Sequence, residues 1–133
     1  MDNKKRLFQT ALKCREFAYA PYSQFKVGAA VLSNEGHFYG GCNVENASYP
    51  CGTCAEAGAI AAMVAGGDTR IKEILIVADT QCIIPCGNCM QKIMEFGSDQ
   101  TVIHCADLQG IRKTFTLNEL MPERFKAEDI HAE

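Results

Sequence analysis

The feature that most constrains this chain is a set of three cysteines and one glutamate, carried by the segments Cys54-Ala55-Glu56 and Pro85-Cys86-Gly87-Asn88-Cys89. Three thiolates can bind a zinc ion and leave its fourth coordination position open for water, as in catalytic zinc sites. A hydrolytic zinc site also needs a group that moves protons, and Glu56 lies two residues from a candidate ligand. We therefore expect a fold that brings Cys54, Cys86 and Cys89 around one ion, with Glu56 beside it.

A second assignment of the cysteines predicts a different kind of zinc site. Cys51-Gly52-Thr53-Cys54 is itself a C-x-x-C pair, and with Cys86 and Cys89 it would place four thiolates around a closed structural zinc. Glu56 would then have no catalytic role, and the chain would be a small zinc-stabilised binding module. Zinc ribbons carry such pairs on tight hairpins, whereas a long alanine-rich helix is predicted between these two pairs, which favours the open site.

Composition limits the remaining possibilities. A chain of 133 residues with 47% apolar residues is predicted to form one domain, residues 1–133. The net charge of −3 disfavours binding to a nucleic-acid polymer, which requires a basic surface. Signal-peptide and membrane-spanning patterns are not evident, so a cytoplasmic protein is expected. In a reducing compartment, the five cysteines that we do not assign to metal are expected to pack as small apolar residues: Cys14, Cys42, Cys51, Cys82 and Cys105.

The order of predicted elements indicates the fold class. Hydrophobic periodicity and turn residues predict a helix over 3–20, strands over 25–32 and 37–44, a helix over 54–65, a strand over 73–78, a helix over 86–96, and strands over 100–105 and 113–116. This order predicts an α/β fold, a three-layer α/β/α sandwich around a mixed sheet of roughly five strands. Both candidate metal segments then fall at helix N-termini, where the helix dipole stabilises thiolates.

On these motifs the chain resembles the small, homotetrameric cytidine deaminases, and the resemblance covers nearly all of it. The C-x-E and P-C-x-x-C segments match the general signature of zinc deaminases. Three further segments carry the resemblance: Phe25-Lys26-Val27-Gly28-Ala29-Ala30, Asn43-Val44-Glu45-Asn46-Ala47-Ser48, and Leu120-Met121-Pro122 with Phe125. The resemblance implies zinc-dependent hydrolysis of cytidine and deoxycytidine to uridine and deoxyuridine plus ammonia, a step in pyrimidine salvage, by a homotetramer with shared sites.

The resemblance also implies which residues bind the substrate. Asn43 and Glu45 lie two apart on a predicted strand, so their side chains share a face, and an amide beside a carboxylate suits the hydroxyls of a sugar. Phe25 is expected near the nucleoside, and the backbone of Ala55 near the base. Phe125 is expected to stack on the pyrimidine in the site of a neighbouring subunit.

Two positions depart from the family pattern. Many relatives have arginine directly after C-A-E and directly after the last zinc cysteine, where this chain has Ala57 and Met90. Three thiolates and Zn²⁺ carry a net charge of −1, which a guanidinium would offset. The departure leaves related substrates open, namely blasticidin S or a modified cytosine nucleoside. An enzyme that edits polynucleotides is disfavoured by the acidic composition and the lack of tryptophan.

Overall fold

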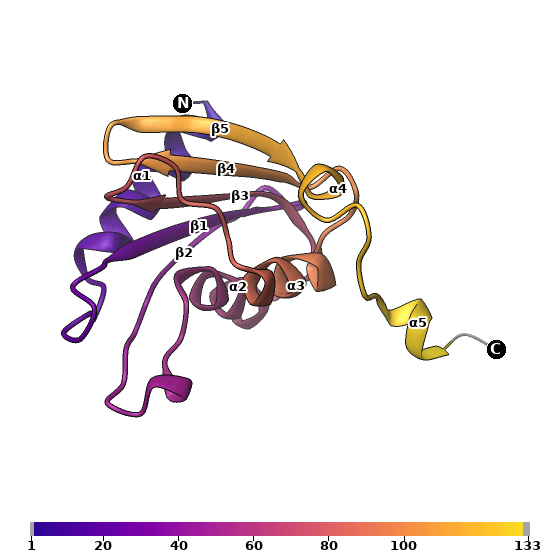
Figure 1. Cartoon of the computed structure of the whole chain (residues 1–133). Helices are drawn as coiled ribbons and strands as arrows, with labels where there is room; N and C mark the ends of the chain where they lie inside the picture. Colours follow the sequence, from indigo (N-terminus) through magenta and orange to yellow (C-terminus); the bar gives the residue numbers. More distant parts are fainter. Residues whose placement is uncertain (1, 132–133) are drawn as a thin grey trace.

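The computed structural model describes residues 2–131 and is built on a mixed sheet of five strands in the order β2-β1-β3-β4-β5 (Figure 1). The strands are β1 (Val27–Ser33), β2 (Phe38–Cys42), β3 (Ile71–Ala78), β4 (Val102–Asp107) and β5 (Gly110–Thr116). Strands β3 and β4 run parallel, whereas the pairs β1–β2, β1–β3 and β4–β5 are antiparallel. The predicted mixed five-stranded sheet is confirmed.

Helices cover the two faces of this sheet. The helices are α1 (Asn3–Glu16), α2 (Ala55–Ala65), α3 (Gly87–Phe96), α4 (Leu117–Leu120) and α5 (Ala127–His131), with a short 3₁₀ helix η1 (Tyr49–Cys51), and α1, α2 and α3 form the covering layers. Leu7 and Ala11 of α1 pack on one face, whereas Met63 of α2 and Ile93 of α3 belong to the core on the other face (Figure 1). Alternate residues of each strand enter these two cores, so the sheet is buried between helix layers.

The first helix is shorter than predicted. It begins after Asp2, whose Oδ1 accepts a hydrogen bond of 2.8 Å from the Lys4 amide, and it ends at Glu16 instead of residue 20. Tyr19 instead pairs with the segment that follows β2, because its amide donates a hydrogen bond of 3.0 Å to the carbonyl of Asn43. Pro21 disfavours helical geometry in the residue before it, which assists this early end.

The C-terminal half follows the prediction, except that β5 is longer than expected and the tail contains a further helix. Strand β5 begins at Gly110, earlier than expected, because the Asp107 carboxylate accepts the amides of Gln109 and Gly110 and forms a tight turn. Helix α4 begins with a capping box between Thr116 and Glu119. The tail, predicted only as a polar segment, contains α5.

Asp68, which follows α2 in the chain, links that end of the helix to the turn between β1 and β2 by hydrogen bonds. One oxygen of the buried Asp68 carboxylate, Oδ2, faces Ser33 Oγ, His37 Nδ1 and Tyr39 Oη, each at 2.8 Å. The His37 contact, followed by the two hydroxyls, lowers the pKa of Asp68 below its usual value. Gly36 takes a φ of +88°, which closes the turn.

Within residues 2–131, no helix is both long enough and apolar enough to cross a membrane.

Candidate active site

Two cysteines are placed at the starts of the two helices on one face of the sheet. Cys54 is the N-cap residue of α2, and Cys86 is the N-cap residue of α3. Both have extended backbones, and neither side chain makes a hydrogen bond to its own helix, so the thiols are free for other partners. A helix N-terminus favours negative charge, which stabilises a thiolate at either position.

Cys89 connects these two helix ends. Its side chain, in the first turn of α3, is 1% exposed and lies close enough to Cys54 and Glu56 for both of them to shift the pKa of its thiol. Burial is the main cause that raises the pKa of the Cys89 thiol, and the charges of Glu56, Cys54 and Cys86 raise it further. The thiols of Cys54 and Cys89 and the Glu56 carboxylate therefore lie close enough to act on one another, with Cys86 nearby, and a cation would relieve their mutual repulsion.

Glu56 is the acidic member of this group. It lies in the first turn of α2 and is only 6% exposed. Burial raises the pKa of its carboxyl above the usual range, while hydrogen bonds, including one with Cys89, and the charge of Lys92 partly oppose that rise. A carboxyl whose pKa is moved toward neutrality is suited to accept and return protons.

The donor chemistry of this group fits zinc. Thiolates are the ligands that zinc takes most readily, and a thiol bound to the metal ionises despite its burial. Across residues 2–131, no three histidine, cysteine or acidic side chains converge as tightly as ligands around a metal ion. Cys86 is exposed and acts on Cys89 through its charge.

The competing four-thiol arrangement involves Cys51, which lies in η1. The Cys51 side chain is exposed, and its Sγ lies 3.6 Å from the hydroxyl of Ser48. Cys51 is not among the groups that act on the buried thiol of Cys89. These influences on Cys89 favour the three-thiolate arrangement, which stays a prediction.

The two residues expected to bind a sugar both contact the segment that leads into β1. Asn43 Oδ1 accepts from the amide of Val27, and Asn43 Nδ2 donates to the carbonyl of Phe25, each at 2.9 Å. Glu45 Oε1 accepts from the amides of Tyr22 and Ser23. The side chains of Asn43 and Glu45 thus hold this segment in place beside the end of β2.

A hollow of about 350 Å³ opens beside Glu45. It is lined by Tyr22, Ser23, Glu45, Asn46, Tyr49 and Gly52. Its lining contains one carboxylate and no basic side chain, and Tyr22 and Tyr49 meet edge to face with ring centroids 6.2 Å apart. An uncharged polar ligand with an apolar ring suits this lining, whereas a phosphate would meet the charge of Glu45 without a cation to offset it.

The remaining substrate residues lie in different places. Phe25 is 39% exposed in the segment held by Asn43, and Ala55 is fully buried as the first residue of α2. Phe125 is 58% exposed, and its carbonyl accepts a hydrogen bond of 2.8 Å from Gln91 of α3. The tail that ends in α5 lies on the opposite side of the molecule from the loop that carries η1 (Figure 1). Within one chain, Phe125 is not brought to the Glu45 hollow.

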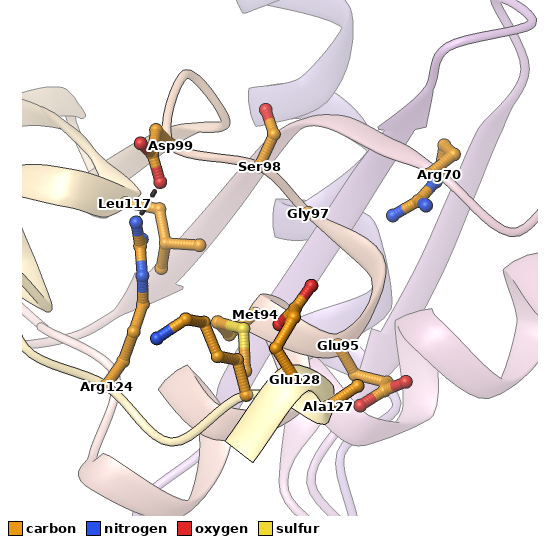
Figure 2. A pocket seen from close by; sticks show the side chains of 11 residues that line it. Arg70, Met94, Glu95, Gly97, Ser98, Asp99, Leu117, Arg124, Ala127 and Glu128 are labelled. Atoms are coloured by element: carbon orange, nitrogen blue, oxygen red, sulfur yellow. Dashed lines mark hydrogen bonds and ion pairs between the residues drawn. The ribbon is translucent and has the colours of Figure 1, made fainter. Parts of the chain in front are cut away.

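The C-terminal segment is fastened to the end of α3. Figure 2 shows a hollow of about 290 Å³ in which Arg124 reaches Asp99 from one side and Glu128 of α5 projects from the other. The guanidinium of Arg124 forms an ion pair with Asp99. This ion pair and the bond from Gln91 to the Phe125 carbonyl hold the backbone at 124–125 against its own subunit while the Phe125 side chain stays exposed.

Three further residues join the site without having been predicted from the sequence. Ser23 donates its hydroxyl to the Glu45 carboxylate, and Lys92, one turn after Cys89, acts on Glu56 through its charge. Cys82 hydrogen-bonds with the buried Cys105, whose pKa is raised to about 12, chiefly by burial. Spacing on α3 is a signal that could have indicated Lys92, since residues three apart share a helix face. The contacts of Ser23 and Cys82 depend on tertiary structure.

Sequence comparison identifies relatives over most of the chain. Residues 1–105 match the family model described as the cytidine and deoxycytidylate deaminase zinc-binding region. A cytidine deaminase of Sporosarcina psychrophila is 40% identical over 131 residues, covering 98% of this chain and 96% of that protein. One from Halalkalibacterium halodurans is 39% identical and covers 97% of this chain and 98% of that protein.

The fold is also similar to solved structures. The crystal structure of a cytidine deaminase from Burkholderia pseudomallei superposes with a TM-score of 0.86 at 39% identity, over 94% of this chain and 100% of that one. The cytidine deaminase of Mycobacterium tuberculosis superposes with a TM-score of 0.80 at 32% identity, over 95% of this chain and 99% of that one. The arrangement of strands and helices described above is therefore shared with these proteins.

Proposed function

This chain belongs to the cytidine deaminase family and is a zinc-dependent hydrolytic enzyme, and on that premise we propose that it deaminates free cytidine and deoxycytidine, releasing ammonia. The observation that carries the proposal is the contact of Cys89 with both Cys54 and Glu56, where the N-termini of α2 and α3 meet. Residues 1–133 are taken to act as one catalytic domain, in line with the nearly full-length match to the relatives.

We assign the roles in the site as follows. Cys54, Cys86 and Cys89 hold the zinc ion, which, when bound, supplies the Lewis acidity that activates water near neutral pH. The buried Glu56 carboxylate would take the two protons of that water in turn and deliver one to the cytosine ring nitrogen and the other to the departing amine, which leaves as ammonia. Burial raises the pKa of the Glu56 carboxyl, which favours its accepting a proton during this transfer.

The lining of the Glu45 hollow supports a nucleoside, not a nucleotide, as substrate. Asn43 and Glu45 are proposed to bind the sugar hydroxyls, Phe25 to pack beside the nucleoside, and the backbone of Ala55 to contact the base. The carboxylate of Glu45, without a basic side chain in the same hollow, disfavours a phosphate group. A polynucleotide is disfavoured for the same reason.

We also propose that the enzyme is a homotetramer. An exposed apolar face, here called the α2–α3 face, is lined by Ala57, Ile60, Ala61, Val64, Ala65, Asn88, Gln91, Lys92, Glu95 and Phe96. Val64 is 43% exposed there, which is costly for a large apolar side chain unless a partner covers it. Phe125 is attached to the same helix through Gln91, so a subunit docked near this face could receive the exposed Phe125 ring in its own site.

Cellular context follows from the cysteines and the chemistry. All eight cysteines are free thiols, and such a set persists in a reducing compartment, so we place the enzyme in the cytoplasm. Conversion of cytosine nucleosides to uracil nucleosides there would serve pyrimidine salvage.

The decisive experiment follows the ultraviolet spectrum of cytidine during incubation with the zinc-loaded protein, its Glu56→Gln variant and a Glu35→Gln control. Glu35 is an exposed carboxylate in the β1–β2 turn. We expect conversion to uridine by the native protein and the control, and a loss of about 10²–10⁴-fold in Glu56→Gln. If the protein converts a modified cytosine nucleoside or blasticidin S but not cytidine, that compound would replace cytidine as the assigned substrate. Zinc binding without turnover of any of them would favour the binding module.

A further inference from the structure

We propose that Ser23 is a positioning residue for nucleoside binding, because its hydroxyl links the carboxylate of Glu45 to the backbone of Phe25. This inference rests on the proposed function above, in which Glu45 receives the sugar and Phe25 packs beside the nucleoside. Ser23 acts through these two residues and has no assigned part in proton transfer.

The contacts of the Ser23 hydroxyl define its role. Ser23 Oγ donates to Glu45 Oε2 and accepts a hydrogen bond of 3.0 Å from the amide of Phe25. A hydroxyl can donate and accept at the same time, whereas a methyl group can do neither. One side-chain atom therefore fixes both the direction of the Glu45 carboxylate and the backbone that carries Phe25.

Glu45 is held by the same short segment at its other oxygen. Its Oε1 accepts the amides of Tyr22 and Ser23 at 2.9 and 3.1 Å. A carboxylate has about four acceptor positions, so the three bonds from this segment leave about one, on Oε2, for a ligand hydroxyl. The bond from Ser23 is also the main cause that lowers the pKa of Glu45, which keeps the carboxylate charged.

The carbonyl side of Phe25 is fixed separately. Asn43 Nδ2 donates to that carbonyl at 2.9 Å, so Phe25 is held through its amide by Ser23 and through its carbonyl by Asn43. Loss of the Ser23 hydroxyl would release the amide side only. The segment would then stay attached but lose its alignment with the hollow beside Glu45.

Ser23 lies apart from the zinc-binding group. Its side-chain partners, Glu45 and Phe25, are not among the groups that act on Cys89 or Glu56. A change at Ser23 is therefore expected to weaken binding of the nucleoside without altering the chemical step, which appears in kinetics as a raised KM at nearly constant kcat.

The test compares Ser23→Ala, Ser23→Thr and Ser98→Ala in the zinc-loaded enzyme. Ser98 is a matched control, because its hydroxyl also accepts the amide two residues ahead, that of Gln100, but makes no hydrogen bond to a carboxylate among residues 2–131. We expect Ser23→Ala to raise KM for cytidine by about 10-fold or more, as for loss of a hydrogen bond to a charged group, with kcat and zinc content unchanged. Ser23→Thr, which retains a hydroxyl, should recover most of the affinity, and Ser98→Ala should match the native enzyme.

A second measurement separates an effect through Glu45 from general loss of structure. In a Glu45→Gln background, Ser23→Ala should raise KM by much less than it does in the native enzyme, since the charged partner is gone. An unchanged KM in Ser23→Ala would overturn the role of Ser23. So would an equal rise in KM in the native and Glu45→Gln backgrounds. Neither result would affect the assignment of the protein as a deaminase. No turnover of cytidine by the native enzyme would overturn the proposed function itself, and this inference with it.

Discussion

Gly41 of β2 lies directly against the backbone of Ala59 in α2. A methyl group added to Gly41 would lie 2.3 Å from the amide nitrogen of Ala59 and 2.7 Å from the carbonyl oxygen of Ala55. Backbone atoms cannot move aside as a flexible side chain can, so glycine at this position sets how closely α2 approaches the sheet. The position of Cys54 at the start of α2 depends on that approach.

The substitution Gly41→Ala is expected to push α2 outward. We expect the free energy of unfolding to fall by about 1–3 kcal/mol, as for other overpacked sites, and zinc retention to fall with it. Urea denaturation and metal analysis would measure both. Gly58→Ala, in α2, is the control, because its methyl group would make ordinary contacts of 3.5–3.7 Å and helix propensity favours alanine. A Gly41→Ala protein as stable as the native one would contradict this account of the packing.

Zinc content should depend on Cys89 and not on Cys51. Cys89→Ser removes the buried thiol that contacts Cys54 and Glu56, so we expect the purified variant to lose its stoichiometric zinc. Cys51→Ser changes an exposed thiol in η1 and should keep one zinc per chain. Metal analysis after dialysis against a weak chelator would decide between them. Loss of zinc from Cys51→Ser would support a closed four-thiolate site.

An arginine installed at position 57 should strengthen zinc binding. Ala57 lines the α2–α3 face together with Lys92, whose charge already acts on Glu56. A guanidinium there would offset the net negative charge of three thiolates and Zn²⁺, as charges near the ligands tune metal affinity by about 10–100-fold. We expect Ala57→Arg to release zinc more slowly to a competing chelator, with Ala57→Gln as the uncharged control. Equal release rates would show that other groups already balance the charge.

Asp68 should contribute to stability at neutral pH and lose that contribution in acid. Its pKa in the folded protein is lowered by its bonds to His37, Tyr39 and Ser33, so the unfolded chain takes up the proton first. The stabilisation is therefore fully present above the ordinary carboxyl pKa of about 3.9 and is lost as the pH falls through the lower, folded value. Thermal unfolding of native protein and Asp68→Asn between pH 3 and 7 should show curves that converge in acid. A constant difference at every pH would exclude this linkage.

Self-association should depend on Val64. Val64→Asp would place a charge on the exposed α2–α3 face, and sedimentation should then detect a smaller assembly than that of the native protein. Glu123→Gln, an exposed change in the tail, is the control. A native protein that sediments as a monomer would remove the basis for shared sites.

Phe125→Ala tests whether the ring acts on a neighbouring subunit's substrate. Stacking of an aromatic side chain on a base contributes about 1–3 kcal/mol, so kcat/KM should fall by about 5- to 150-fold while zinc content stays constant. Native activity in this variant would place the Phe125 ring outside the site.

The sequence was most informative where local chemistry and periodicity agree. The apolar run in β3 and the glycines after α2 predicted those elements closely, and C-x-x-C spacing placed Cys86 and Cys89 on one helix start. The early end of α1 could not be predicted, because the pairing of Tyr19 with Asn43 is a tertiary contact. The hydrogen bond between Ser23 and Glu45 could not be predicted for the same reason, since the two residues meet only after β1 and β2 have paired.

The chain order of the candidate ligands also bears on how the protein is made. Ribosomes extend a chain at about 5–20 residues per second, so Cys89 emerges a few seconds after Cys54. Both precede β4 and β5, whose pairing completes the sheet next to α3. A nascent chain therefore presents every zinc ligand before the parallel β3–β4 pair can form. Metal captured at that stage would hold α3 against α2 and shorten the search for this parallel pairing.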